Sequence, residues 1–199
     1  MPLDFQILLH KGEIMQGLSY VLSALGLISM ICASMIKGTK FSIVLFLVFC
    51  GNMLVATSYL IGGAGINGAA ACYFGGIQTL INYFYSSRNI PLPRWLIAFY
   101  AGFTIVLNIF VAGGISLLGL LVIVASLIFI VCVCQKNGTA YRFWTLINML
   151  LWCIYDILSG SYSVLVAHVP QLIFVIAGIL IYDRQAYAEK FSRLSKKTS

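Results

Sequence analysis

The sequence predicts an all-α membrane protein with seven transmembrane helices, and three observations lead to this fold class. Of the 199 residues, 61% are hydrophobic and 9% are charged, whereas about 25% are charged in a typical soluble domain. Long apolar segments recur along the whole chain, each close to the ~20 residues that a helix needs to cross a bilayer. Basic residues stand only at the ends of these segments. A soluble enzyme with a membrane anchor is excluded, because no stretch between the segments is long enough to form its own core.

Seven apolar segments have the length of a membrane span. They run over residues 17–36, 41–61, 65–85, 95–113, 115–133, 141–158 and 162–182. The residues before and after them are more polar, and an internal repeat (below) groups the spans. We therefore expect five parts: an outer interfacial segment (1–16), a first three-helix repeat (17–85), a loop with a linker helix (86–114), a second three-helix repeat (115–182) and a basic cytoplasmic tail (183–199).

The basic residues alternate between the two sides of the membrane that these spans define. One side receives only Lys11. The other side receives Lys37, Lys40, Arg88, Arg94, Lys136, Arg142, Arg184, Lys190, Arg193, Lys196 and Lys197. Because positively charged loops stay in the cytoplasm, the N-terminus is predicted outside and the C-terminus inside. A distribution of this kind marks topology, so no nucleic-acid partner is expected, and the bilayer is the predicted partner of the charged ends.

Spans 1 to 3 resemble spans 5 to 7. The string "SALGLI" in the first span is similar to "SLLGLL" in the fifth, and "NMLVATSY" from Asn52 is similar to "NMLLWCIY" from Asn148. Gln78 in the third span and Gln171 in the seventh occupy a third matched position. A single linker span between the triplets makes both enter the membrane from the same side. The pattern therefore predicts two parallel repeats related by an axis along the membrane normal, an arrangement known in transporters.

This three-plus-one-plus-three plan resembles that of the SWEET sugar transporters and their PQ-loop relatives, with "VPQ" at residues 169–171 similar to the signature of that superfamily. The signature lies in the last span, and the first triplet has "GGIQ" at the corresponding place. The closer resemblance is to the bacterial inner-membrane YgjV family. It is carried by "RFWTLINMLLWCIYDILSGSYSVLVAH" (142–168) and by "LINYFYSSRNIP" in the first triplet. The resemblance implies solute transport and a location in a bacterial inner (plasma) membrane.

Two ionisable residues lie within the predicted spans. Asp156 is near the outer end of the sixth span, and His168 is about two turns into the seventh. An ionisable side chain in hydrocarbon costs at least ~2.5–3.5 kcal/mol and therefore has a reason to be there. The short link between the spans allows the two side chains to pair, which would form a proton site. Alternatively, Asp156 caps the helix end and a neutral His168 makes one interhelical hydrogen bond.

Uncharged polar and aromatic side chains in the spans predict a solute site near the middle of the membrane, where transporter sites commonly lie. The predicted solute-binding residues are Asn52, Gln78, Asn82, Asn148, Trp152, Tyr155 and Gln171. Amides and aromatic faces suit a small, neutral solute that bears hydroxyl or amide groups. In the SWEET relatives an aromatic residue and an asparagine of each triplet line the pocket. Trp152 matches that aromatic residue, but Ala56 stands at its repeat partner, so the pocket is expected to be asymmetric.

The alternative for each of these amides is a hydrogen bond that holds two helices together. Pro170 interrupts the hydrogen bonds of the last span and is a candidate hinge. No P-loop, dinucleotide fingerprint, metal-ligand cluster or carboxylate pair is present in the sequence, so no enzyme activity, cofactor or metal is expected. The sequence favours a small-solute transporter that works by alternating access between two three-helix bundles. The competing function is a non-transporting membrane protein, in envelope assembly or bound to a partner, whose polar residues only pack helices.

Overall fold

In the computed structural model, which describes residues 3–36, 41–63, 65–135 and 137–184, the regular structure is all helical. Seven α-helices follow one another along the chain: α1 (Leu3–Met35), α2 (Phe41–Ile61), α3 (Ile66–Ser87), α4 (Arg94–Val111), α5 (Leu117–Val133), α6 (Gly138–Ser159) and α7 (Tyr162–Gly178). The last helix continues into a short π-helix, η1 (Ile179–Asp183). Most of the basic tail predicted at 183–199 lies outside the described residues.

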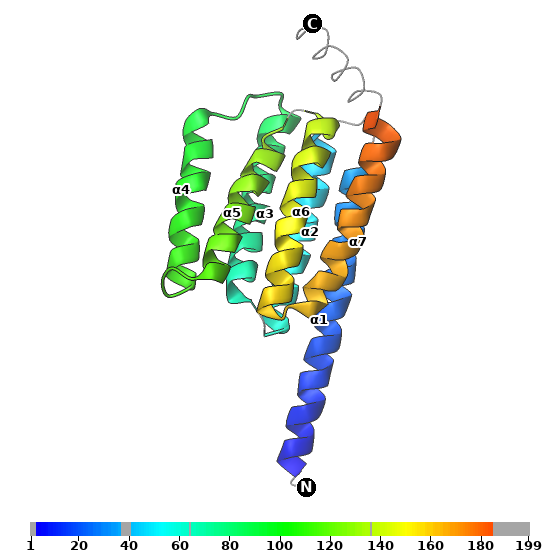
Figure 1. The fold of residues 1–199 in the computed structure, drawn as a ribbon, viewed down its shortest axis with the longest axis vertical. Coiled ribbons are helices and arrows are strands. Elements are labelled where there is room, and N and C mark those ends of the chain that lie inside the picture. The colour runs from blue at the N-terminus through cyan, green and yellow to red at the C-terminus, as the bar shows by residue number, and fades with distance from the viewer. Residues whose placement is uncertain (1–2, 37–40, 64, 136, 185–199) are drawn as a thin grey trace, which may run out of the picture.

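The helices coincide with the seven predicted segments to within a few residues, except at the start of α1. This helix already begins at Leu3, so described residues of the predicted interfacial segment continue it as one helix. Figure 1 shows the first turns of α1 extending beyond the rest of the bundle. Its apolar, span-like part begins at Gly12. The segment before the first span is therefore helical where the structure describes it.

Four of the described helical segments are long and apolar enough to cross a membrane. They are Gly12–Met35, Phe41–Ile61, Arg94–Val111 and Tyr162–Asp183. Helix α5 is equally apolar but shorter, with 17 residues. Helices α3 and α6 have 22 residues each and carry more polar side chains, many of them buried against other helices. Four long apolar helices indicate an integral membrane protein.

The bundle has two layers and one helix at its edge (Figure 1). In one layer α2 packs along both α1 and α3, and in the other α6 packs along both α5 and α7. The layers meet where α1 contacts α7 and α3 contacts α5. Helix α4 lies at the edge and packs against α3 and α5. Short connections force consecutive helices to run antiparallel, so α1 begins at one end of the bundle and η1 ends at the other.

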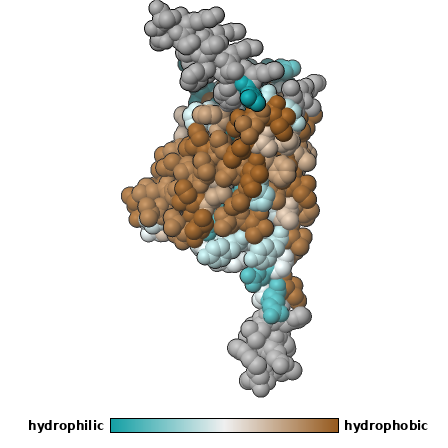
Figure 2. Space-filling view, turned by 45° about the vertical axis from the view of Figure 1, so that its right-hand side comes forward, coloured by the Kyte–Doolittle hydropathy of each residue, from teal (hydrophilic) through white to brown (hydrophobic). Residues whose placement is uncertain are grey.

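The outer surface of the bundle is apolar, as expected of helices that face lipid. Figure 2 shows hydrophobic residues covering the middle of one face, with hydrophilic residues toward its ends. Large apolar side chains stand fully out of the bundle, for example Phe110 at 83% exposure and Ile115 at 77%. A soluble monomer rarely exposes apolar surface so continuously. The surface therefore agrees with the membrane location that the helix lengths indicate.

The contact between α1 and α2 depends on small residues. A Cβ atom on Gly26 would lie 2.9 Å from Val55 Cγ2, and one on Gly51 would lie 2.8 Å from the Met30 side chain. Further along the same pair of helices, the Ser23 hydroxyl lies 2.6 Å from that of Ser58. Small residues allow the helix backbones to approach closely, and hydroxyl pairs join helices in an apolar medium.

Candidate functional site

A cavity lies in the middle of the bundle, and all seven helices contribute to its wall. We call it the central cavity. Asn52, Asn148 and Ser126 on its wall are each near the middle of their helix. The space available to the centre of a water molecule is about 30 Å³. A buried water needs roughly 10–15 Å³ on this measure, so the cavity has room for about two waters.

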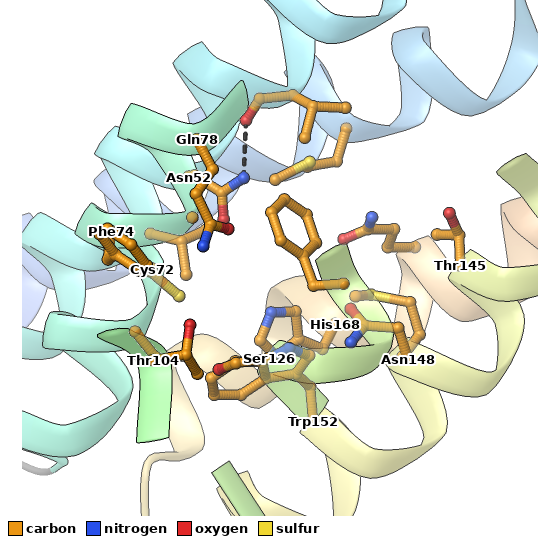
Figure 3. A pocket seen from close by; sticks show the side chains of 18 of the residues that line it. Asn52, Cys72, Phe74, Gln78, Thr104, Ser126, Thr145, Asn148, Trp152 and His168 are labelled. Carbon is orange, nitrogen blue, oxygen red and sulfur yellow. Dashed lines mark hydrogen bonds between the residues drawn. The ribbon is translucent and has the colours of Figure 1, made fainter. Parts of the chain in front are cut away.

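Five of the seven predicted solute-binding residues line the central cavity. They are Asn52, Gln78, Asn148, Trp152 and Gln171. Figure 3 shows Asn52 and Gln78 on one side of the space, with Trp152 and Asn148 approaching it from α6. Asn82 and Tyr155 do not line it. Asn82 lies one turn beyond Gln78 on α3 and donates to Val133 O of α5 (3.2 Å), whereas the Tyr155 hydroxyl accepts the Gly68 N–H (3.2 Å).

The central cavity collects buried polar atoms that have no hydrogen-bond partner. Among the described residues, five buried side-chain atoms lack a partner, and four of them belong to residues on this wall. The four are Gln78 Nε2, Thr104 Oγ1, Asn108 Oδ1 and Ser126 Oγ. A buried polar atom without a partner costs about 1–3 kcal/mol. Four of them around one small space are therefore expected to be satisfied by a polar guest, either water or a solute.

Helix α4 supplies two of these four atoms, although the sequence predicts it only as a linker. Its buried residues are Leu96, Tyr100, Thr104 and Asn108. They recur every four residues, so they form one stripe along the helix. Asn108 Nδ2 donates to Thr104 O (2.9 Å), which leaves its Oδ1 for the cavity. The polar end of this stripe is the sequence signal that could have added Thr104 and Asn108 to the predicted site.

The predicted partners Asp156 and His168 are hydrogen-bonded at one end of the central cavity. His168 Nδ1 lies 2.6 Å from Asp156 Oδ2, and the Tyr59 hydroxyl donates to Asp156 Oδ1. The Asp156 side chain is fully buried. We call these three residues the Asp156 network. The contact of Tyr59 with Asp156 was not predicted, because Tyr59 lies on α2 and meets α6 only through tertiary packing.

The turn between α6 and α7 makes the Asp156 network possible. Helix α6 ends at Gly160, which has a φ of 71°, a left-handed conformation that glycine adopts without strain. The chain reverses there, so α7 returns along α6 and His168 comes level with Asp156. His168 also lies on the wall of the central cavity, where its ring centroid is 5.9 Å from that of Trp152. The network therefore connects a buried carboxylate to the cavity wall.

A second buried charged group lies at the opposite end of the bundle, where α6 begins. Arg142 forms a bidentate ion pair with Asp183 of η1, with Nε–Oδ2 and Nη2–Oδ1 distances of 2.7 Å. Thr139 Oγ1 also donates to Asp183 Oδ1 (2.7 Å), and Arg142 Nη1 donates to Ser34 O of α1 (3.4 Å). Arg142 and Asp183 are both buried. In the sequence, Arg142 marked the topology and began the string that resembles the YgjV family, and its pairing with Asp183 was not predicted.

The candidate hinge, Pro170, lies inside α7 between two wall residues, His168 and Gln171. A proline in this position removes one hydrogen bond from the helix backbone. The flanking residues His168 and Gln171 therefore sit at the weakest point of α7. Any bend of the helix there would move both side chains relative to the central cavity.

Comparison with models of known protein families, with curated proteins and with solved structures gives no significant match to this chain. The fold and the site themselves define the class: an all-helical integral membrane protein whose bundle encloses a small polar cavity.

Proposed function

We propose that this protein transports a small, uncharged polar solute across a membrane. The observation that carries the proposal is the group of four unpartnered polar atoms around the central cavity. Burying these atoms without partners costs free energy, and a polar guest that hydrogen-bonds to them recovers it. The cavity also lies near the middle of the helices, where transporter sites are commonly found. The resemblance of the sequence to the YgjV family supports a location in a bacterial inner membrane.

The chemistry of the wall supports a neutral solute. Gln78 Nε2 is a donor, Asn108 Oδ1 is an acceptor, and the hydroxyls of Thr104 and Ser126 serve as either. Trp152 adds an aromatic face. The described residues on the wall include no Asp, Glu, Lys or Arg, so a strongly charged solute has no fixed counter-ion there. Hydroxyl and amide groups match this set of donors and acceptors.

Alternating access between two three-helix bundles is the mechanism that we propose. The closed cavity has room for about two waters, so a larger solute needs the triplets α1–α3 and α5–α7 to separate. Pairs of matched positions support a twofold relation between the triplets. Asn52 and Asn148 both line the cavity, and so do Gln78 and Gln171. Pro170 would let α7 bend during this motion, and seven membrane crossings with an outside N-terminus complete the proposed topology.

We further propose that the Asp156 network binds the proton that drives transport. A carboxylate and an imidazole at 2.6 Å share a proton and keep their hydrogen bond whichever of them holds it. The Tyr59 hydroxyl donates to the other oxygen of Asp156 and holds the carboxyl group in place. Because His168 also lies on the cavity wall, a proton gained or lost there changes the electrostatic potential at the solute site.

One set of contacts favours the competing function, a membrane protein that does not transport. Asn148 Nδ2 donates to Ala125 O of α5 (2.6 Å), and Asn82 Nδ2 donates to Val133 O of the same helix (3.2 Å). These two bonds join helices, as expected of amides that serve packing. Packing therefore explains why Asn82 and the Nδ2 group of Asn148 are buried. It does not explain the four unpartnered atoms on the cavity wall.

A thermal-shift screen of the detergent-purified protein tests the proposed function. The panel contains sugars, nucleosides, vitamins, amino acids and quaternary amines. A solute at a hundred times its Kd adds roughly 2.7 kcal/mol to the folded state that binds it. Asn148→Ala is expected to abolish the shift. Asn82→Ala is the matched control, because Asn82 is also a buried asparagine bonded to an α5 carbonyl but lies off the cavity.

A saturable shift that Asn148→Ala removes and Asn82→Ala retains would support a solute site in the central cavity. Uptake of that solute into proteoliposomes then separates transport from binding alone. A shift that both variants lose would point to packing rather than to solute contact. An absence of shift, together with an absence of uptake for every solute in the panel, would favour the non-transporting function.

A further inference from the structure

A second pocket lies at the end of the bundle where η1 ends, between the ends of α3 and α5 and the start of α4. Its wall includes Asn82, Tyr85, Ser86, Arg94, Val133 and Cys134. We call it the end pocket. Its volume is about 360 Å³, within the range of roughly 300–1,000 Å³ that small-molecule sites occupy. The exposed Arg94 on its wall shows that it reaches the molecular surface.

The end pocket and the central cavity are stacked along the same helices. On α3 the central cavity reaches Gln78 and the end pocket begins at Asn82; on α5 the corresponding residues are Phe129 and Val133. Residues four apart in a helix are about one turn, or roughly 5.4 Å, apart along its axis. A single layer of side chains therefore separates the two spaces.

Two hydrogen-bonded side chains lie in that layer. Tyr100 of α4 is 1% exposed and its hydroxyl donates to Asn82 Oδ1 at 3.3 Å. Asn82 in turn donates to Val133 O at 3.2 Å. On its other side, the Tyr100 ring lies edge-on to Phe74, a residue of the central cavity wall, with centroids 6.2 Å apart. We call Asn82 and Tyr100 the Tyr100 layer.

The two ends of the central cavity are closed with different strength. At one end the Asp156 network joins three helices with charge-assisted hydrogen bonds, including the 2.6 Å contact of His168, and such bonds are about twice as strong as neutral ones. At the other end the Arg142–Asp183 pair joins α1, α6 and η1, whereas between α3, α4 and α5 the Tyr100 layer has two neutral bonds, at the long limit of hydrogen-bond geometry. The Tyr100 layer is therefore the part of this end that opens at lower cost.

From this stacking we infer that the end pocket is the vestibule of the central cavity and that the Tyr100 layer is the gate between them. The inference rests on the proposed function, because it names the route by which a solute reaches that site. It also assigns α4 a role beyond linking the triplets. Tyr100 is part of the gate, and Thr104, one turn further along the same stripe, lines the central cavity.

Thiol labelling tests the route without a solute. The Ser126→Cys variant places a thiol on the central cavity wall. The probe, 2-hydroxyethyl methanethiosulfonate, is small and neutral; the thiolate attacks its sulfenyl sulfur, a mixed disulfide forms and methanesulfinate leaves. Peptide mass spectrometry reads the modification at residue 126 separately from that of the native cysteines. All variants carry Cys134→Ala and Cys72→Ala, because Cys134 lies on the end pocket wall and Cys72 on the central cavity wall.

The first comparison blocks the vestibule. In a protein that also carries Ser86→Cys, a bulky fluorescein maleimide is attached to residue 86 before the probe is added. Ser87→Cys is the matched control, because Ser87 is the next residue of α3 and is exposed but does not line the end pocket. The maleimide at residue 86 is expected to slow labelling at residue 126 about tenfold or more, because it blocks the route by which the probe reaches that thiol. The maleimide at residue 87 leaves the rate unchanged.

The second comparison weakens the gate. Tyr100→Phe removes only the hydroxyl and is expected to accelerate labelling at residue 126 about fivefold, the factor for one neutral hydrogen bond. Ser58→Cys reports on general loosening, because Ser58 is fully buried away from both spaces, and its labelling rate stays constant. Equal slowing by the two maleimides, or equal acceleration at residues 58 and 126, would overturn the inference. If both labelling comparisons give the expected result but no solute in the thermal-shift screen binds, only the proposed function is contradicted.

Discussion

Tyr59 and Tyr155 stand at the same place in the two copies of the repeated string, and their rings meet edge to face with centroids 6.2 Å apart. The pair lies beside Gly68 near the start of α3. A Cβ atom on Gly68 would be 2.9 Å from Tyr59 Cζ and 3.1 Å from Tyr155 Cε1. The two tyrosines and the glycine therefore fix how closely α2, α3 and α6 approach one another next to Asp156.

Gly68→Ala is expected to destabilise the bundle, because the added methyl group would press on two tyrosine rings that are both buried. Overpacking of this kind costs about 1–3 kcal/mol. Gly102→Ala is the matched control, since a Cβ atom there meets nothing within 4 Å, and the substitution is expected to stabilise the α4 helix by roughly 0.5–1 kcal/mol. Thermal unfolding in detergent measures both. A Gly68→Ala protein as stable as the Gly102→Ala protein would contradict the packing described here.

Thr104→Val is expected to leave the solute-free protein as stable as the wild type or to stabilise it by up to about 1–3 kcal/mol, because it removes a buried hydroxyl that has no partner. The same substitution is expected to weaken the shift produced by a bound solute. Thr79→Val serves as the control, because the buried Thr79 hydroxyl donates to Gly75 O at 2.6 Å. A Thr104→Val protein that is less stable but binds solute normally would show that Thr104 serves packing alone.

Breaking the buried pair of Arg142 and Asp183 on one side is expected to cost about 3–5 kcal/mol, because the remaining charge stays buried without its partner. Arg142→Met and Asp183→Leu are the single changes. Combining them is expected to restore most of the stability, since two apolar side chains need no partner. A double-mutant cycle by thermal unfolding measures the coupling. Strictly additive effects would show that the two residues act independently.

Asp156→Asn and His168→Ala are each expected to abolish the dependence of uptake on a pH gradient, because each removes one of the two groups that share the proton. The measurement is uptake of the identified solute into proteoliposomes with and without an imposed gradient. Tyr59→Phe is the control: it removes one hydrogen bond to Asp156 but keeps the carboxylate and the imidazole together. If both principal variants responded to the gradient as the wild type does, the network would not carry the coupling proton.

Composition and segment length were enough to predict the helices, because burial in lipid requires continuous apolar stretches and leaves few alternatives. The prediction of the cavity wall depended on the repeat, which placed Asn52 and Asn148 at equivalent positions. The start of α1 was less predictable. The opening sixteen residues, with His10, were predicted to lie along the outer interface, and the structure shows that the helix of the first span already begins at Leu3.

Tertiary contacts account for what the sequence did not reveal. The approach of Tyr59 to Asp156 joins residues 97 positions apart, and no local pattern predicts such a pairing. Asp183 looked like the first residue of a polar tail, and its burial becomes visible only once η1 packs over Arg142. Thr104 is small and surrounded by apolar residues, so its place on the cavity wall follows from the packing of α4 rather than from its own type.

The pair of Arg142 and Asp183 also bears on how the protein assembles during synthesis. The two residues are 41 positions apart, so a growing chain presents the guanidinium of Arg142 well before its carboxylate partner is made. Until then, water and lipid headgroups at the membrane surface are the available partners of that charge. Once Asp183 is made, the ion pair can form while Arg142 also donates to Ser34 O of α1. The bonds by which this pair joins α1, α6 and η1 can therefore be completed only after η1 has been synthesised.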